Sequence, residues 1–349
     1  MHDFAVYIGR FQPFHNAHFE TVKFGLQQAK RLLVVIGSDH QARTIKNPWT
    51  TDERIAMVSN ALSREELSRV TFVPVKDHRY NDNLWIAAVQ QAISEATAAD
   101  DDDETPTKDR DIVLVGNPKD ASSFYLRLFP QWTFVQAPLI SISTSVVNAT
   151  KIRTLMFSLD KIGIKHMLPV SVYEAVIGFM ETDEFKRLHE EYHHILAYKS
   201  AWDGAPFPPT FNTVDAVCVC SGHVLVVRRR ASPGRGLIAL PGGFIKQDEL
   251  LVDACLRELK EETAIKMHPQ ELKKLIASEK VFDHPTRSLR GRTITHAFCI
   301  NLGRSELPRV KGEDDADKAW WMPLNDVYVK EAEFFDDHFH IINYFINRF

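Results

Sequence analysis

Apolar residues in the first half of the chain follow two alternating patterns. Short continuous runs rich in Val, Ile and Leu are typical of buried strands, and the stretches between them have the spacing of amphipathic helices. We expect strands at residues 4–9, 32–37, 70–75, 111–116 and 133–137, and helices at 18–30, 51–62, 84–98 and 121–129. Buried strands separated by such helices predict an α/β domain with a parallel sheet covered on both faces. Ligands of such sheets bind at the carboxyl ends of the strands.

The second half of the chain has a different order of elements. Residues 212–220 and 223–229 read as strands joined by Ser221-Gly222, which is a hairpin signal. Further strands are expected at 274–282, 293–302 and 319–322, and helices at 250–264, 325–329 and 336–349. Residues 170–198 have a helical pattern, and the stretch 202–209 is rich in turn residues. We therefore predict a first domain at 1–183, a helical linker at 184–204 and a second domain at 205–349.

Composition narrows the classes of function. Of the 349 residues, 44% are hydrophobic and 25% charged, and the net charge is −4. Such a chain has no overall basic field for nucleic acid or an anionic membrane. No apolar run approaches about 18 residues and no signal-peptide pattern opens the chain, so we expect a cytoplasmic enzyme with small-molecule partners. Homo-oligomer formation is left open. The four cysteines, Cys218, Cys220, Cys255 and Cys299, are expected to be buried thiols.

Three carboxylates gather on one predicted helix. Glu258, Glu261 and Glu262 stand at i, i+3 and i+4, so they share a face, and Arg257 can pair with Glu261. The helix follows a Pro241-Gly242-Gly243 turn, which suits a close approach of backbone and ligand. Gathered carboxylate oxygens are what Mg²⁺ or Mn²⁺ prefers. The alternative is a solvated acidic surface.

The same stretch resembles the Nudix hydrolase box: Gly243, five residues, Glu249, seven residues, and then Arg257-Glu258-Leu259-Lys260-Glu261-Glu262. One departure is Ala264, where the family usually has Gly. The resemblance implies an α/β/α sandwich and hydrolysis of a nucleoside diphosphate compound with Mg²⁺ or Mn²⁺ as cofactor. It implies catalytic roles for Arg257, Glu258, Glu261 and Glu262, with the three glutamates and Glu249 as metal ligands.

Residues after the box resemble ADP-ribose pyrophosphatases. The matching stretches are Phe282-Asp283-His284-Pro285, Arg290-Gly291-Arg292 and Gly312–Ala316 before Trp320-Trp321. The resemblance implies ADP-ribose as the substrate. The residues expected to bind it are Arg228, Arg292, Gly242, Gly243 and Asp314.

The loop after the first strand carries Gly9-Arg10-Phe11-Gln12-Pro13-Phe14-His15-Asn16-Ala17-His18. His15 and His18 are three residues apart at a helix start, where backbone N–H groups attract phosphate. By themselves they favour two polar capping histidines, and half of a metal site is an alternative. The loop resembles the first motif of the nucleotidyltransferase superfamily, which has a Rossmann-like fold. Val147–Arg153 resembles its second motif, with Asn148 in place of the usual Ser. The resemblance implies catalysis of adenylyl transfer from ATP by His15, His18 and Arg153.

Other stretches resemble nicotinamide-nucleotide adenylyltransferases, which join nicotinamide mononucleotide (NMN) and ATP. The residues expected to bind ATP or NMN are Gly9, Arg10, Phe11, Lys46, Trp49, Arg54, Asn83, Trp85, Gly116, Lys119, Asp120, Asn148 and Thr150. Trp49 could stack on the cationic nicotinamide ring, or it could simply pack, and packing is also the alternative for Trp85. The acidic stretch 95–110 is expected to be a solvated loop rather than a metal site.

The whole chain resembles bacterial bifunctional nicotinamide-nucleotide adenylyltransferase–Nudix proteins. The resemblance implies two enzymes of NAD metabolism in one chain. An alternative first domain would accept nicotinate mononucleotide or phosphopantetheine. An alternative Nudix domain would bind ADP-ribose as a regulatory module without hydrolysing it.

Overall fold

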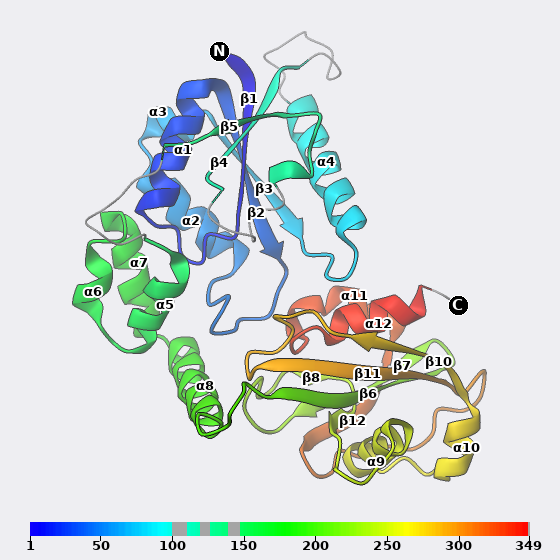
Figure 1. Cartoon of the computed structure of the whole chain (residues 1–349). Coiled ribbons are helices and arrows are strands. Elements are labelled where there is room, and N and C mark those ends of the chain that lie inside the picture. The colour runs from blue at the N-terminus through cyan, green and yellow to red at the C-terminus, as the bar shows by residue number, and fades with distance from the viewer. Residues whose placement is uncertain (100–109, 119–125, 139–146, 348–349) are drawn as a thin grey trace. The chain divides into compact units, whose positions relative to one another are not determined.

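The computed structural model describes residues 1–99, 110–118, 126–138 and 147–347 (Figure 1). The chain divides into two compact units, Met1–His189 and Glu190–Phe349. Helix α8 (Asp183–Ser200) contains the point of division, which lies inside the segment 184–204. The domain limits given above stay a prediction.

The N-terminal unit is built on a parallel sheet. Its described strands are β1 (His2–Gly9), β2 (Ala29–Asp39), β3 (Val70–Lys76), β4 (Ile112–Gly116) and β5 (Thr133–Gln136). They pair in the order β3-β2-β1-β4-β5, and each pairing is parallel. The strand order reverses between β1 and β4, and crevices at such points are where ligands of open α/β sheets bind. The predicted parallel α/β fold is confirmed.

Helices cover this sheet on both faces (Figure 1). The larger ones are α1 (Asn16–Gln28), α2 (Thr51–Ala61) and α4 (Asp82–Ala98), with a short α3 (Arg64–Leu67) before β3. On one face Val89 and Ile93 of α4 pack on Val73 of β3 in a common core. After β5 come α5 (Ala149–Phe157), α6 (Lys161–Lys165) and α7 (Val170–Met180).

The C-terminal unit, described up to residue 347, is a mixed sheet between helices. Its strands are β6 (Thr210–Cys220), β7 (His223–Arg229), β8 (Ile238–Ala239), β9 (Gly242–Phe244), β10 (Ile276–Phe282), β11 (Arg292–Asn301) and β12 (Ala316–Pro323). The main path runs β10-β11-β6-β7-β12, with β8 paired to β7 and β9 paired to β6. Only the β6–β11 pairing is parallel among these described strands, so the sheet is mixed as expected.

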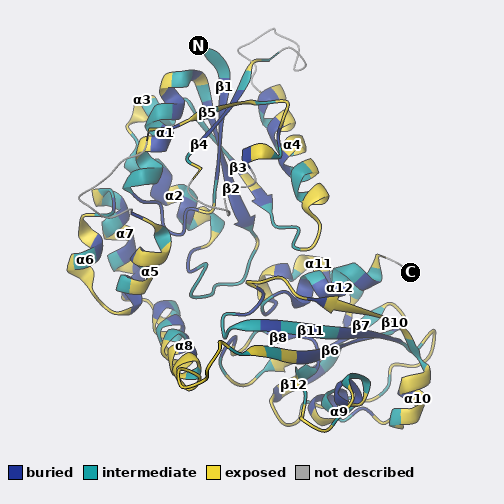
Figure 2. Cartoon of the chain, in the orientation of Figure 1, coloured by how far each residue is buried: buried dark blue, intermediate teal, exposed yellow. Residues whose placement is uncertain are grey.

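Two hydrophobic cores lie on opposite faces of this sheet (Figure 2). Helices α9 (Leu251–Thr263) and α10 (Pro269–Lys274) cover one face, where Leu256 and Leu259 pack against Ala216. Helices α11 (Leu324–Val329) and α12 (His338–Ile346), joined through η3 (Glu331–Glu333), cover the other face. This is the predicted α/β/α sandwich.

The structure corrects several details of the sequence prediction. A helix, α10, occupies Pro269–Lys274, so the strand predicted to begin at residue 274 begins at Ile276. The short elements α3, α5, α6, β8 and β9 were not predicted, because two to nine residues carry too little periodicity. Residues 121–125 of the predicted helix 121–129 lie outside the described residues, as do residues 100–109 of the acidic stretch. The four cysteines are free and buried, as expected. Within the described residues, none of the helices has both the length and the apolar character that crossing a membrane requires.

Candidate active sites

The loop after β1 makes a sharp turn at the carboxyl end of the central strand. Phe11 has a positive φ of 51°, and its ring folds back over Gly9, where an added Cβ would lie 2.7 Å from the ring. Only glycine fits under that ring without a shift of the aromatic side chain. Phe11 is 1% exposed, so it shapes the loop from inside, whereas the neighbouring Arg10 is exposed.

His15 and His18 lie together at the start of α1. His15 is the N-cap, and its Nδ1 accepts a hydrogen bond from the His18 N–H at 3.3 Å. The two imidazole rings are stacked with centroids 3.6 Å apart, and Phe11 packs edge-on against His18. The capping interpretation and the catalytic interpretation therefore describe the same geometry: the cap brings both rings to one helix N-terminus, which favours negative charge.

The second motif meets the first although about 140 residues separate them. Asn148 caps α5, and its Oδ1 accepts from the Lys151 N–H at 2.8 Å. Arg153, one turn further along, donates from Nη1 to the Gln12 carbonyl at 2.6 Å and from Nη2 to Thr150 Oγ1 at 3.3 Å. Asn148 thus does the capping that Ser would do at this position, and it leaves Arg153 beside the loop of His15.

Four cationic side chains converge near these loops. Burial, and then the positive charges of Arg10, Arg79 and Arg153, lower the pKa of Lys46 to about 8. Burial and Arg10 also lower the pKa of Arg153, to about 10. Like charges held together in this way repel each other unless an anion joins them. The cluster is therefore suited to the phosphates of a nucleotide.

Arg79 is a residue of this cluster that the sequence analysis missed. Its Nη1 is buried and has no hydrogen-bond partner among the described residues. Arg79 lies three residues after the carboxyl end of β3, at the edge of the sheet where ligands bind. Its position just after a predicted strand could have identified Arg79, but it belongs to none of the motifs found in the sequence.

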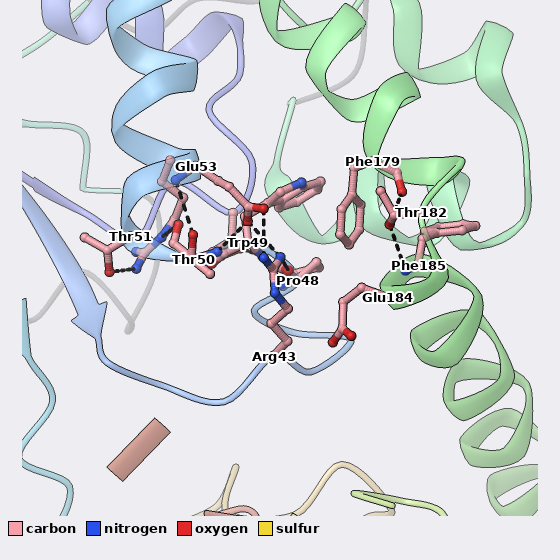
Figure 3. A network of polar contacts seen from close by, with 12 residues as sticks. Arg43, Pro48, Trp49, Thr50, Thr51, Glu53, Phe179, Thr182, Glu184 and Phe185 are labelled. Atoms are coloured by element: carbon pink, nitrogen blue, oxygen red, sulfur yellow. Dashed lines mark hydrogen bonds and ion pairs between the residues drawn. The ribbon is translucent and has the colours of Figure 1, made fainter. Parts of the chain in front are cut away.

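Two residues predicted to contact nucleotide have side chains that are buried in other contacts. Trp49 is 3% exposed and packs against Phe179, with ring centroids 5.3 Å apart (Figure 3). Arg54 is 1% exposed, and its guanidinium donates to the carbonyls of Arg10, Gly37, Ser38 and Thr50. These observations favour packing for Trp49 and loop fixation for Arg54. A sequence motif does not distinguish a residue that contacts nucleotide from one that only supports the site, because both kinds of residue lie near the site.

The loop between β2 and α2 is held rigidly. Arg43 forms a bidentate ion pair with Glu53, and Glu53 and Thr50 complete a capping box at the start of α2 (Figure 3). Gln12 donates to the Trp49 carbonyl and accepts from the Trp49 N–H. These bonds fix the loop that carries Lys46 against the loop that carries the histidines.

The remaining predicted nucleotide contacts lie on other elements. Trp85 is half-buried on α4 and packs on Phe129, whereas Asn83 on the same helix is exposed. Gly116 ends β4, and its carbonyl accepts from the Ala137 N–H. Lys119 and Asp120 lie outside the described residues.

In the C-terminal unit, Arg257 organises the acidic cluster of α9. Its guanidinium binds Glu249 through Nε at 2.9 Å and Nη2 at 2.7 Å, and its Nη1 binds Glu258 at 2.7 Å and Glu261 at 2.8 Å. The hydrogen bonds from Arg257 are the main reason why the pKa of Glu249 falls to about 2. The predicted pairing of Arg257 with Glu261 is confirmed. Glu249 is thus held by Arg257 and serves first to orient the cluster.

Glu258 and Glu262 face the glycine turn. An added Cβ on Gly243 would lie 2.7 Å from Glu258 Oε1, and the Gly242 N–H donates to Glu262 Oε2 at 3.0 Å. Burial raises the pKa of both carboxyls, for Glu262 to about 8, despite the Gly242 N–H and with a further rise from Glu258. Glu262 is 7% exposed, so the solvated-surface interpretation does not hold for it.

The late acidic loop lies next to the same cluster. The Glu313 N–H donates to the Glu262 carbonyl, and the Lys311 N–H donates to the Thr263 carbonyl. The negative charge of Asp314 contributes to the raised pKa of Glu258, and that of Asp315 to the raised pKa of Glu262. Asp314 therefore lies near Glu258.

A divalent cation fits the chemistry of this donor set. Among the described side chains, no three His, Cys, Asp or Glu residues are already arranged around a single point. However, burial raises the pKa of the half-buried Glu258 and of the buried Glu262, and for Glu258 the hydrogen bond from Arg257 does not offset that rise, so added positive charge would stabilise both ionised carboxylates. A divalent ion would supply that charge, and oxygen ligands suit Mg²⁺ and Mn²⁺.

The two predicted substrate arginines lie apart from this cluster in sequence. Arg228 is exposed at the end of β7, with its guanidinium 5.8 Å from the centre of the Trp320 ring. Arg292 begins β11; it donates to the Asp283 carbonyl and lies 3.7 Å from the Asp283 carboxylate. The structure brings Gly242, Gly243, Glu258 and Glu262 together directly, and it brings in Asp314 through the late loop.

Two family models match the two halves of the chain. The model described as "NUDIX domain" matches residues 209–345, and the model described as "Cytidylyltransferase-like" matches residues 6–148. The first spans the acidic cluster of α9 and the late loop, and the second spans the histidine loop and Lys46 but ends before Arg153.

Similar proteins agree with this division. A nicotinamide/nicotinic acid mononucleotide adenylyltransferase of Acinetobacter baylyi is 34% identical over 190 residues, 54% of this chain and 93% of the relative. A nicotinamide-nucleotide adenylyltransferase of Sulfurisphaera tokodaii is 31% identical over 179 residues, 49% of this chain and 89% of the relative. A crystal structure of a bifunctional NMN adenylyltransferase/ADP-ribose pyrophosphatase from Francisella tularensis, complexed with AMP and a manganese ion, matches with a TM-score of 0.90 and 32% identity. That match covers 100% of this chain and 99% of the Francisella chain.

Proposed function

This chain belongs to the family of bifunctional NMN adenylyltransferase/ADP-ribose pyrophosphatase proteins, and on that basis we propose that it carries both activities. The N-terminal unit joins NMN and ATP to give NAD and pyrophosphate. The C-terminal unit hydrolyses ADP-ribose to AMP and ribose 5-phosphate with a divalent cation. The observation that supports this most directly is that each unit holds its own charged site, cationic in the first and anionic in the second.

Adenylyl transfer requires no nucleophile from the protein. The phosphate of NMN attacks the α-phosphorus of ATP, and pyrophosphate leaves. The chain must position the two nucleotides and stabilise negative charge on the phosphoryl oxygens. Lys46, Arg10, Arg79 and Arg153 supply positive charge, and His15 and His18 supply donors at the helix N-terminus.

Hydrolysis of ADP-ribose places a dianionic diphosphate against buried carboxylates. A divalent cation, when bound, would neutralise part of this charge and would lower the pKa of the attacking water. Within the chain, Glu258 and Glu262 would hold the ion, and Arg257 keeps Glu258 and Glu261 in place through its hydrogen bonds. Gly243 keeps the backbone close enough for the substrate to reach Glu258. We propose Mg²⁺ or Mn²⁺ for this ion; the manganese in the Francisella relative supports it.

Two assays on the full chain test the proposal. NAD formation is measured from NMN and ATP, with nicotinate mononucleotide as a parallel acceptor. ADP-ribose hydrolysis is measured by release of AMP. Arg153→Ala should abolish NAD formation and leave ADP-ribose hydrolysis unchanged. Glu262→Gln should abolish ADP-ribose hydrolysis and leave NAD formation unchanged. In each variant the activity that remains shows that the chain is still folded. Binding of ADP-ribose without any hydrolysis would contradict the second activity and favour a regulatory module.

A further inference from the structure

A set of polar and charged side chains lies buried next to the glycine turn of the Nudix site and outside the box. We call it the buried polar network, and its members are between 0% and 7% exposed: Asp215 on β6, Arg287 before β11, Thr295 on β11, and Asp337 and His338 at the start of α12. Charged groups leave water only at a large cost unless they are paired and hydrogen-bonded. Their placement here therefore needs an explanation.

Arg287 ties the elements of the network together. Its guanidinium donates twice to Asp337, from Nε to Oδ2 at 3.0 Å and from Nη2 to Oδ1 at 2.9 Å. The same Nη2 lies 3.8 Å from Asp215 Oδ2, and that oxygen accepts a hydrogen bond from Thr295 Oγ1 at 2.6 Å. Such charge-assisted, bidentate contacts fix direction as well as distance, so the Asp215 carboxylate is held in one orientation.

Two members of the network contact the glycine turn. The Leu240 N–H donates to His338 Nδ1 at 2.9 Å. Asp215 pairs in register with Gly242, and an added Cβ on Gly242 would lie 2.7 Å from Asp215 Oδ1. The Gly242 N–H donates to Glu262 Oε2 at 3.0 Å. A single residue, Gly242, thus stands between the network and the Glu262 carboxylate.

His338 is in the protonation state that this contact requires. Because its Nδ1 accepts from the Leu240 N–H, that nitrogen carries no proton, and the neutral ring carries its proton on Nε2. Burial lowers the pKa of His338, although Asp215 and Asp337 lie nearby and oppose the change. The ring is therefore neutral at pH 7, and the acceptor for Leu240 is present.

Packing alone does not explain these polar groups. Apolar side chains of similar volume often stabilise a fold at least as well as a buried ion pair does. Directional groups add a fixed position for the backbone at Leu240 and Gly242. The buried carboxylate of Glu262 depends on that position, because it accepts its hydrogen bond from Gly242.

We propose that Asp215 and His338 are positioning residues for ADP-ribose hydrolysis. They hold Leu240 and Gly242 so that the Gly242 N–H orients the Glu262 carboxylate toward the divalent cation. They act through the backbone and not by contact with the reacting atoms. The proposal rests on the ADP-ribose hydrolysis proposed above, and it predicts an effect on metal affinity that needs no substrate.

The first test compares His338→Leu with His338→Asn in the full chain. The two new side chains have nearly the same size, but only asparagine offers an acceptor to the Leu240 N–H. We expect His338→Leu to lower the affinity for Mn²⁺ at least about tenfold in the absence of nucleotide, the effect of losing support for a metal ligand. The kcat for ADP-ribose hydrolysis should fall to a similar extent with KM little changed, and His338→Asn should keep most of both values.

Mn²⁺ affinity is measured by calorimetric titration, and the site compared is the one that Glu262→Gln removes. NAD formation and the thermal transition of the C-terminal unit show that each variant is folded. An equal loss in His338→Leu and His338→Asn would mean that the ring only packs. That result, or an unchanged Mn²⁺ affinity in His338→Leu, would overturn the role of His338.

The second test reaches Asp215 through Thr295. Thr295→Val keeps the volume and removes the hydroxyl that binds Asp215, whereas Thr295→Ser keeps the hydroxyl and removes a methyl group. Positioning predicts that the valine variant loses about tenfold in Mn²⁺ affinity and that the serine variant stays close to the unmodified chain. Packing predicts the reverse order, which would overturn the role of Asp215. This pair also decides the proposal if His338→Leu does not fold.

The results distinguish this proposal from the one on which it rests. If the unmodified chain binds Mn²⁺ at Glu262 but does not hydrolyse ADP-ribose, the proposed function fails, and the Mn²⁺ affinities of the variants still test the network. If it hydrolyses ADP-ribose but the members of each pair behave alike, the network is only structural and the present proposal is wrong. If it binds no Mn²⁺ without nucleotide, the orientation of Glu262 toward the ion is wrong.

Discussion

At the scale of single residues, Ala264 of the Nudix box has a backbone conformation that is unfavourable for alanine. It ends α9 with φ 47° and ψ 29°, the left-handed conformation in which glycine is usual. Its N–H still donates to the Lys260 carbonyl, so the helix end has the expected geometry despite the Cβ. The departure from the family sequence therefore affects strain and not the position of Glu258 or Glu262.

Replacing Ala264 by glycine should stabilise the C-terminal unit. The substitution removes the left-handed penalty of an L-residue but adds entropy to the unfolded chain, so we expect a gain of about 1 kcal/mol in the free energy of unfolding. Thermal or urea unfolding measures it. Ala99→Gly is the control, since Ala99 caps α4 with φ −76° and should only lose stability. An equal effect at both positions would contradict the strain at Ala264.

Lys46 should make ATP binding sensitive to pH. Its pKa of about 8 in the free protein means that its charge is lost as pH rises through 8, whereas bound phosphate would keep it protonated. The KM for ATP should rise by up to about tenfold between pH 7 and 9. Lys46→Arg should flatten that profile, because arginine keeps its charge. A wild-type profile that is flat from pH 7 to 9 would argue against a role of Lys46 at the phosphates.

The lowered pKa of Lys46 also affects stability: a rise in pH weakens ATP binding but favours the folded state. Because the folded pKa lies below the ordinary 10.5, the unfolded chain holds more protons between pH 8 and 10.5. The contribution of Lys46 to the free energy of unfolding therefore rises with pH in that window. Comparing unfolding of the wild type and Lys46→Met at pH 8 and 10 isolates this contribution.

At the scale of elements, the glycine turn and α9 act as one unit. The turn places Gly243 against Glu258 and Gly242 against Glu262, and Arg257 ties the helix back to Glu249 before it. The sequence predicted the helix, its polar face and the turn. It did not predict which carboxylate each backbone group would meet, because that depends on how α9 packs on β6 and β9.

Gly243→Ala tests this arrangement. The new Cβ would lie 2.7 Å from the Glu258 carboxylate and would displace it, so ADP-ribose hydrolysis should fall by about 100-fold, as when a metal ligand is misplaced. NAD formation should not change. Gly178→Ala is the matched control, since an added Cβ there meets nothing within 4 Å. Unchanged hydrolysis in Gly243→Ala would show that Glu258 does not need that position.

At the scale of the whole molecule, two units with separate cores each carry a site. We therefore expect two thermal transitions in calorimetry, one for each unit. Saturating Mn²⁺ without nucleotide should raise only the transition of the C-terminal unit, by about 5 °C, because the ion binds its folded carboxylates. Glu262→Gln should reduce that shift, and a chelator should abolish hydrolysis. If Mn²⁺ raised only the transition of the N-terminal unit, the metal site would lie in that unit, and this prediction would be wrong.

The sequence by itself determined the two fold classes, the order of most long elements and the residues of three motifs. It could do so because periodicity reports burial and because the motif residues lie close together along the chain. The tertiary structure alone decided which of these residues are buried in packing and which gather with residues from distant segments. Trp49 and Arg54 are neighbours of Lys46 in sequence, yet both are buried in packing or backbone contacts, whereas Lys46 joins Arg79 and Arg153 from distant segments. Burial and electrostatic proximity depend on contacts between residues far apart in the chain, and no local pattern encodes them.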